Sequence, residues 1–122
     1  MGAPELAQRR CEACGPGTPA LSEEEAADLH RRIDAAWSRE GNHVIRRRFG
    51  FGNFRDAFGF ATRVALLAEG EGHHPDVDVG WGRVVLTLTT HAAGGLTPND
   101  FIMAAKIDQL SEGLGLKVQR RE

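Results

Sequence analysis

The sequence has little of three things that would point to particular functions: cysteine, excess charge and long apolar runs. Its formal net charge is −2 and its pI is near 6.2, so it has no overall attraction to nucleic acid or to an anionic membrane. The one basic run, Arg46–Arg48, stands among apolar residues and is interpreted as the solvated part of a strand. No apolar stretch approaches the length that spans a bilayer, and the N-terminus lacks the apolar core of a secretory signal. These absences favour a cytoplasmic protein without nucleic-acid or membrane partners.

Only two cysteines occur, Cys11 and Cys14, spaced as C-x-x-C near the N-terminus. A structural zinc site needs four ligands, of which they supply two, and a redox pair is expected at the start of a helix. Here glycines and prolines follow at positions 15, 16, 17 and 19. We therefore expect residues 1–20 to be a flexible leader with reduced thiols and no metal or cofactor, although metal binding and redox chemistry stay open as alternatives. The whole chain is 41% hydrophobic, and residues 21–122 suffice for one domain with a single core.

The first half of that domain contains a helix and a hairpin. Ser22 and Glu25 are spaced as a capping box, and apolar residues recur at helical spacing over residues 21–37, which predicts a helix there. Gly41-Asn42 separates two short, partly apolar runs within residues 37–52, a pattern typical of a β-hairpin.

The residue pattern over 53–70 predicts a second helix, with Asn53 as its N-cap and Gly70 as its C-terminal end. Its expected buried stripe consists of Phe54, Phe58, Ala61, Ala65 and Ala68.

Residues 76–81 alternate polar and apolar side chains, and residues 83–91 are rich in β-branched residues with Val84, Leu86 and Leu88 on one face. Both segments favour strands. A last helix is predicted from Thr97 to Leu110, with Met103, Ile107 and Leu110 facing inward. The order α-β-β-α-β-β-α predicts an α+β fold, a four-stranded antiparallel sheet with three helices packed on one face. Its exposed strand edges favour a homo-oligomer.

The adjacent His73 and His74 stand directly before Pro75. Imidazole can exchange a proton near neutral pH, and Pro75 holds His74 away from helical geometry. Such a pair can be an exposed polar loop with no chemistry. However, His91 follows His73 by 18 residues, and an antiparallel hairpin between them would return the chain to its starting point. All three imidazoles would then line one cleft, with Glu69 one helical turn before His73, and could accept and deliver protons.

These residues resemble the signature of the pterin-4a-carbinolamine dehydratase family. It consists of an acidic residue, His-His-Pro, an aromatic residue, a histidine and an aspartate, which here are Glu69, His73-His74-Pro75, Trp81, His91 and Asp100. The resemblance extends from about residue 21 to residue 110, and the C-x-x-C leader resembles bacterial members. It implies that His73, His74 and His91 are catalytic. Glu69, Pro75, Thr89 and Thr90 would contact or orient the substrate, whereas Trp81 and Asp100 would be structural, Asp100 as a cap of the last helix.

The family removes water from 4a-hydroxytetrahydropterin and yields quinonoid dihydropterin, which serves tetrahydropterin recycling for aromatic amino-acid hydroxylases. This resemblance implies a pterin as partner, a homodimer or homotetramer, and neither metal nor cofactor. Two other possibilities remain: a non-catalytic binding scaffold on the same fold, of the coactivator or assembly-chaperone type, and a metal site built from the same histidines. Against the metal site, vicinal histidines are awkward ligands, and no acidic or cysteine partner has ligand spacing.

Overall fold

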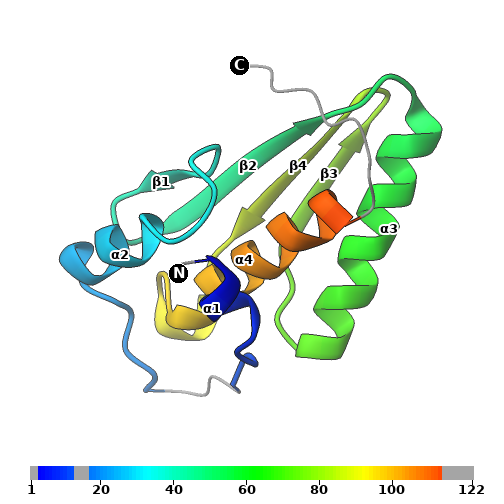
Figure 1. Ribbon diagram of the computed structural model, residues 1–122. Coiled ribbons are helices and arrows are strands. Elements are labelled where there is room, and N and C mark those ends of the chain that lie inside the picture. The colour runs from blue at the N-terminus through cyan, green and yellow to red at the C-terminus, as the bar shows by residue number, and fades with distance from the viewer. Residues whose placement is uncertain (1–2, 13–16, 114–122) are drawn as a thin grey trace.

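A computed structural model of the chain describes residues 3–12 and 17–113, and shows a four-stranded antiparallel sheet with helices on one face (Figure 1). The strands are β1 (Ser38–Glu40), β2 (Val44–Gly50), β3 (Asp76–Gly80) and β4 (Arg83–Leu88), in the order β1-β2-β4-β3. The helices are α1 (Ala3–Ala7), α2 (Glu23–His30), α3 (Phe54–Glu71) and α4 (Pro98–Gly113), with a short 3-10 helix, η1 (His91–Ala93). The predicted α+β class and the antiparallel sheet are confirmed, and α1 is an additional helix within the leader.

Helix α2 begins as predicted but ends earlier. Ser22 and Glu25 form the reciprocal capping box, with N···O distances of 3.1 and 2.9 Å. The helix ends at His30 rather than near residue 37. The following residues form turns because two carboxylates hold their backbone: Asp34 accepts from the Ala36 N–H, and Asp108 accepts from the Asp34 N–H.

Helix α3 has the predicted N-cap but another end and another buried face. Asn53 accepts a hydrogen bond from the Asp56 N–H at 2.7 Å. The helix continues past Gly70 to Glu71, and Gly72, at φ 70°, is the left-handed cap, a conformation that favours glycine. The predicted stripe was wrong at three positions, because Phe54, Phe58 and Ala65 are exposed. The buried side chains are instead Ala57, Phe60, Ala61, Val64 and Ala68.

The buried face of α3 differs from the predicted one because of aromatic packing. The Phe60 ring lies 4.7 Å from the Phe49 ring and 5.5 Å from the Phe51 ring, so it anchors α3 to the end of β2. On the sheet, Val84, Leu86 and Leu88 are buried as predicted. This apolar face of β4 and the facing side of α4 make up the centre of the core.

The basic run Arg46–Arg48 was expected to be solvated, but one of its residues is buried. Arg46 and Arg48 are exposed, but Arg47 points into the core and its Nη1 lies 2.6 Å from Oδ1 of Asp108 on α4. The same oxygen accepts a hydrogen bond from Trp37 Nε1 at 2.8 Å. Burial raises the pKa of Asp108, while the bonds from Trp37 and Asp34 and the charge of Arg47 act in the opposite direction. This cluster ties the first turns of the domain to β2 and α4.

We predict that Asp108→Ala lowers the free energy of unfolding by about 3 kcal/mol, because it leaves the buried Arg47 without its nearest counter-charge. Asp34, 3.6 Å from Arg47, retains part of the pairing. Urea denaturation measures the loss. The matched control is Asp28→Ala, which removes an exposed ion pair with Arg31 and should cost under about 1 kcal/mol. Equal losses for the two variants would show that the buried cluster contributes little.

Candidate active site

The β3–β4 hairpin brings the two histidine segments together. Residues 73–75 connect α3 to β3, and Asp76 at the start of β3 pairs with Thr87 near the end of β4. The chain then passes through Thr89 and Thr90 into η1, which begins at His91. His73, His74, Thr89, Thr90 and His91 consequently line one pocket of about 290 Å³. The geometric part of the sequence prediction, that the three histidines line one cleft, agrees with this arrangement.

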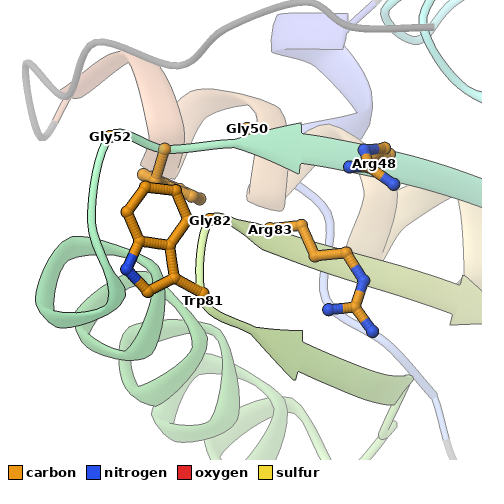
Figure 2. A pocket seen from close by; sticks show the side chains of 7 residues that line it. Arg48, Gly50, Gly52, Trp81, Gly82 and Arg83 are labelled. Carbon is orange, nitrogen blue, oxygen red and sulfur yellow. The ribbon is translucent and has the colours of Figure 1, made fainter.

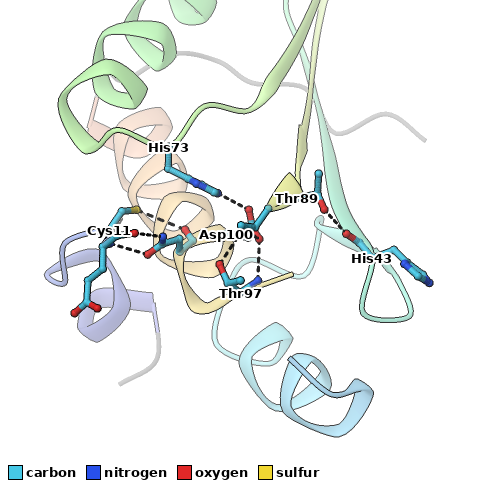
Figure 3. Close-up of polar contacts among 9 residues, drawn as sticks. Cys11, His43, His73, Thr89, Thr97 and Asp100 are labelled. Carbon is cyan, nitrogen blue, oxygen red and sulfur yellow. Dashed lines mark hydrogen bonds and ion pairs between the residues drawn. The ribbon is translucent and has the colours of Figure 1, made fainter. Parts of the chain in front are cut away.

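His73 is the most firmly held of the three histidines. Its Nε2 lies 2.6 Å from Oδ1 of Asp100, and only 12% of its side chain is exposed (Figure 3). An ionised carboxylate accepts hydrogen bonds only, so Nε2 carries a proton and donates it. In the neutral ring, Nδ1 is then the nitrogen with a free lone pair.

Asp100 is fully buried and has two roles. Its second oxygen, Oδ2, accepts the Thr97 N–H at 3.0 Å, which is the capping bond predicted from the sequence. The same oxygen accepts the Thr90 hydroxyl at 2.8 Å, and the Thr90 and Thr97 hydroxyls lie 2.8 Å apart. Asp100 therefore caps α4, as expected, and in addition fixes the ring of His73. Its contact with His73 was not part of the sequence prediction.

The other two histidines are more open to solvent. His74 Nε2 lies 3.1 Å from Glu69 Oε1, with both side chains largely exposed. His91 is exposed on η1 and also lines the pocket. Thr89 donates its hydroxyl to the His43 carbonyl oxygen at 2.6 Å (Figure 3). Glu69 and Pro75, expected near the substrate, are not among the pocket-lining residues, and Glu69 reaches the site only through His74.

The pocket also contains residues that sequence reasoning missed. Glu12 from the leader and Asn99 from α4 line it, together with Gly72 and Ala92. The position of Asn99, directly before Asp100, was the one feature of the sequence that could have placed it near the pocket. Nothing in the sequence indicated that Glu12 lies nearby. Cys14, the second cysteine of the C-x-x-C motif, lies outside the described residues.

Trp81 lies away from this site. It occupies the turn between β3 and β4, at the opposite end of β4 from Thr89, beside a second pocket of about 470 Å³ that includes Arg48 and Arg83 (Figure 2). Its side chain is 69% exposed. Trp81 thus stands at the hairpin turn as expected, although most of its ring does not pack in the core.

Among residues 3–12 and 17–113, no three or more histidine, cysteine or acidic side chains gather in a group that could hold a metal ion. In the same part of the chain, no helix is both long and apolar enough to cross a membrane. The pocket combines one histidine held by a buried carboxylate with two exposed histidines. This arrangement is suited to proton transfer by imidazoles.

The fold and the pocket define an α+β protein in which three histidines line one pocket. The family model described as pterin 4 alpha carbinolamine dehydratase matches residues 19–110. The chain belongs to this family, and membership classes it as a hydro-lyase.

Relatives cover most of the chain. A protein of Rubrobacter xylanophilus named "Putative pterin-4-alpha-carbinolamine dehydratase" is 46% identical over 106 residues, which are 87% of this chain and 98% of the relative. One of Chloroflexus aurantiacus with the same name is 53% identical over 93 residues, 75% of this chain and 97% of the relative. A crystal structure of a transcriptional coactivator/pterin dehydratase from Brucella melitensis is 38% identical with a TM-score of 0.68 and covers 75% of this chain and 97% of that chain.

We predict that Asp100→Ala lowers the free energy of unfolding by about 1–3 kcal/mol, because the buried Thr90 hydroxyl and Thr97 N–H lose their shared acceptor. Thermal unfolding followed by circular dichroism measures this. Glu69→Ala, which removes the exposed contact of His74, is the control and should change stability by less than about 1 kcal/mol. A normal unfolding temperature for Asp100→Ala would contradict the structural role of this carboxylate.

Proposed function

We propose that this protein dehydrates 4a-hydroxytetrahydropterin to quinonoid dihydropterin and water by histidine acid–base catalysis. The observation that carries the proposal is the pocket that His73, His74 and His91 line together, with His73 held by a buried carboxylate. The family to which the chain belongs supports the substrate class.

The reaction needs two proton transfers. The hydroxyl group at C4a leaves as water once it is protonated, and a ring nitrogen of the pterin loses a proton as the new double bond forms. His73 is suited to the base role, since its Nε2–H donates to Asp100 and its Nδ1 is left to accept a proton. We assign delivery of a proton to the leaving hydroxyl to His91, which lines the same pocket. His74, held by Glu69, orients the substrate or shares a proton transfer.

The remaining predicted site residues act mainly by positioning. The Thr90 hydroxyl is already bonded to Asp100, so Thr90 supports the substrate indirectly through His73. The Thr89 hydroxyl donates to His43 and can still accept a hydrogen bond from the flat pterin ring. Pro75 restricts the backbone of His74. The proposed biological use is recycling of tetrahydropterin after aromatic amino-acid hydroxylation.

A non-catalytic scaffold is the second candidate. It is favoured by the similarity to the Brucella melitensis protein, whose name joins a transcriptional coactivator to the dehydratase. Absence of turnover in the wild-type protein, measured with synthetic 4a-hydroxytetrahydropterin, would favour the scaffold over the enzyme.

We predict that His73→Ala and His91→Ala each lower kcat by about 10²–10⁴-fold, the usual contribution of a positioned acid or base. The fold should persist, because neither side chain belongs to the core. Formation of the quinonoid product, followed by absorbance, measures the rate above that of spontaneous dehydration. His43→Ala, which changes an exposed histidine outside the pocket, should leave kcat unchanged. Normal turnover by a variant lacking all three pocket histidines would refute the catalytic proposal.

We also propose that the protein is a homo-oligomer in which a second copy covers the exposed side of α3. Phe54 and Phe58 stack there with ring centroids 5.7 Å apart, although both are about half exposed, and Leu66 follows two turns later. In addition, β3 is an edge strand paired only with β4 among the described strands. Exposed apolar patches and open strand edges are the features that subunit contacts cover.

We predict that the wild-type protein sediments above its monomer mass of 13.3 kDa and that Phe58→Glu shifts it toward the monomer, because a buried charge opposes the contact. Leu66→Glu tests the other end of the same stripe. Arg63→Glu, on the same helix but outside the apolar stripe, is the control and should leave the mass unchanged. A monomeric wild-type protein at micromolar concentration would contradict this proposal.

A further inference from the structure

The leader is attached to the domain at α4. Helix α1 contacts α4, and Leu6 is buried at 1% exposure (Figure 1). Lys106 of α4 donates a hydrogen bond to the Ala7 carbonyl oxygen at 2.7 Å and lies 3.5 Å from Glu71 at the end of α3. The flexibility expected for residues 1–20 remains a prediction, but Leu6 is buried and Ala7 and Cys11 are hydrogen-bonded to the domain.

Beyond α1, the chain is held at Cys11 and Glu12. The Asn99 amide bonds to both backbone groups of Glu12: its Nδ2 donates to the carbonyl oxygen at 2.6 Å, and its Oδ1 accepts the N–H at 2.9 Å. The Cys11 N–H donates to Glu71 Oε1 at 3.0 Å. This bond, opposed by burial and assisted by Lys106, lowers the pKa of Glu71. A two-way amide–backbone contact of this kind fixes the chain in one register.

The contact lies directly beside the histidine pocket. Asn99 is the neighbour of Asp100, which holds His73, and both Glu12 and Asn99 line the pocket with the histidines. Figure 3 shows Cys11 and His73 on the same side of Asp100. The leader is therefore one boundary of the space that the substrate would occupy.

We propose that Glu12 of the leader forms a wall of the substrate pocket and that Asn99 is the positioning residue that holds this wall in place. Cys11, the neighbour of Glu12, anchors the same part of the leader to Glu71. The proposal rests on the dehydratase function proposed above. Loss of the wall would leave the imidazoles in place, because Asp100 holds His73 independently of the leader. Substrate affinity should therefore fall while proton transfer in the bound complex continues.

Cys11 provides a direct measure of leader docking. Its thiol lies 3.7 Å from the Asn99 carbonyl oxygen. Desolvation by burial, followed by the nearby charge of Glu71, raises the pKa of Cys11 from 9.0 to about 12. The thiolate is the nucleophile in alkylation. The difference between these two pKa values lowers the thiolate fraction near pH 8 roughly a thousandfold, so docking should slow alkylation of Cys11 by about that factor. In a Cys14→Ser background, Cys11 is the only cysteine in the chain.

The test uses Asn99→Ala and Leu6→Ala in the full chain with Cys14→Ser. Asn99→Ala removes the clamp, whereas Leu6→Ala loosens α1 without changing any pocket-lining residue. Both variants should raise KM about tenfold, a loss of about 1.4 kcal/mol of binding free energy, because the pocket loses its leader wall in each, and kcat should stay within about twofold. Both should also speed iodoacetamide labelling of Cys11 by about tenfold or more. Biopterin, a stable pterin without the 4a-hydroxyl group, should bind both variants more weakly and slow Cys11 labelling in the background protein.

Asn53→Ala is the matched control, since it removes an asparagine side chain that bonds to backbone at the other end of α3. It should leave KM and Cys11 labelling unchanged, which separates leader docking from general destabilisation. Fast Cys11 labelling in Leu6→Ala would show that the leader has left its place. If KM were nevertheless normal, the leader proposal alone would be overturned, because substrate affinity would not depend on the wall. A wild-type protein that neither turns over the carbinolamine nor binds biopterin would overturn the proposed function, and the leader proposal with it.

Discussion

A single buried carboxylate, that of Asp100, connects three separate parts of the chain. It accepts hydrogen bonds from Thr90 after β4 and from Thr97 before α4, and it holds the His73 ring in the turn after α3. A fully buried carboxylate is costly unless its oxygens are satisfied. The same requirement that stabilises this helix end therefore also fixes the orientation of one imidazole. The stability of the fold and the geometry of the candidate site therefore depend on the same residue.

Helix α4 carries a second buried carboxylate two turns later, at Asp108, which contacts Trp37 and Arg47. The two acids join two different sets of residues to one helix. With the sheet on one side and α1 on another, α4 is buried at almost every position from Asn99 to Asp108. Such a helix is a rigid support for the wall of a pocket, as a site that depends on proton-transfer distances requires.

The three pocket histidines differ in how firmly they are held. His73 is largely buried and bonded to Asp100, whereas His74 and His91 are exposed and are thereby free to adjust to a ligand. This difference fits a site in which one ring is oriented before the substrate arrives. It also explains why the boundary formed by the leader matters, since a pocket with two exposed rings depends on its remaining walls to confine a flat molecule.

Much of this architecture follows from local patterns in the sequence. The capping box at Ser22, the cap at Asn53 and the alternation from Val84 to Leu88 are decided by neighbouring residues, because hydrogen bonds and side-chain periodicity act within one element. The strand patterns between His73 and His91 likewise allowed a hairpin that would bring the histidines together. The roles of the individual histidines remain predictions.

Other features depended on contacts between distant segments. The buried face of α3 turned away from Phe54 and Phe58 because Phe60 packs on two aromatic rings in and just after β2. Arg47 entered the core because Asp108, 61 residues later, supplies its counter-charge. Glu12 reached the pocket because Asn99, 87 residues away, bonds to its backbone. Local periodicity cannot encode such pairings, since their free energy exists only once the elements have packed. The sequence by itself determined the elements and the residue types available for chemistry. The tertiary structure decided which of them meet.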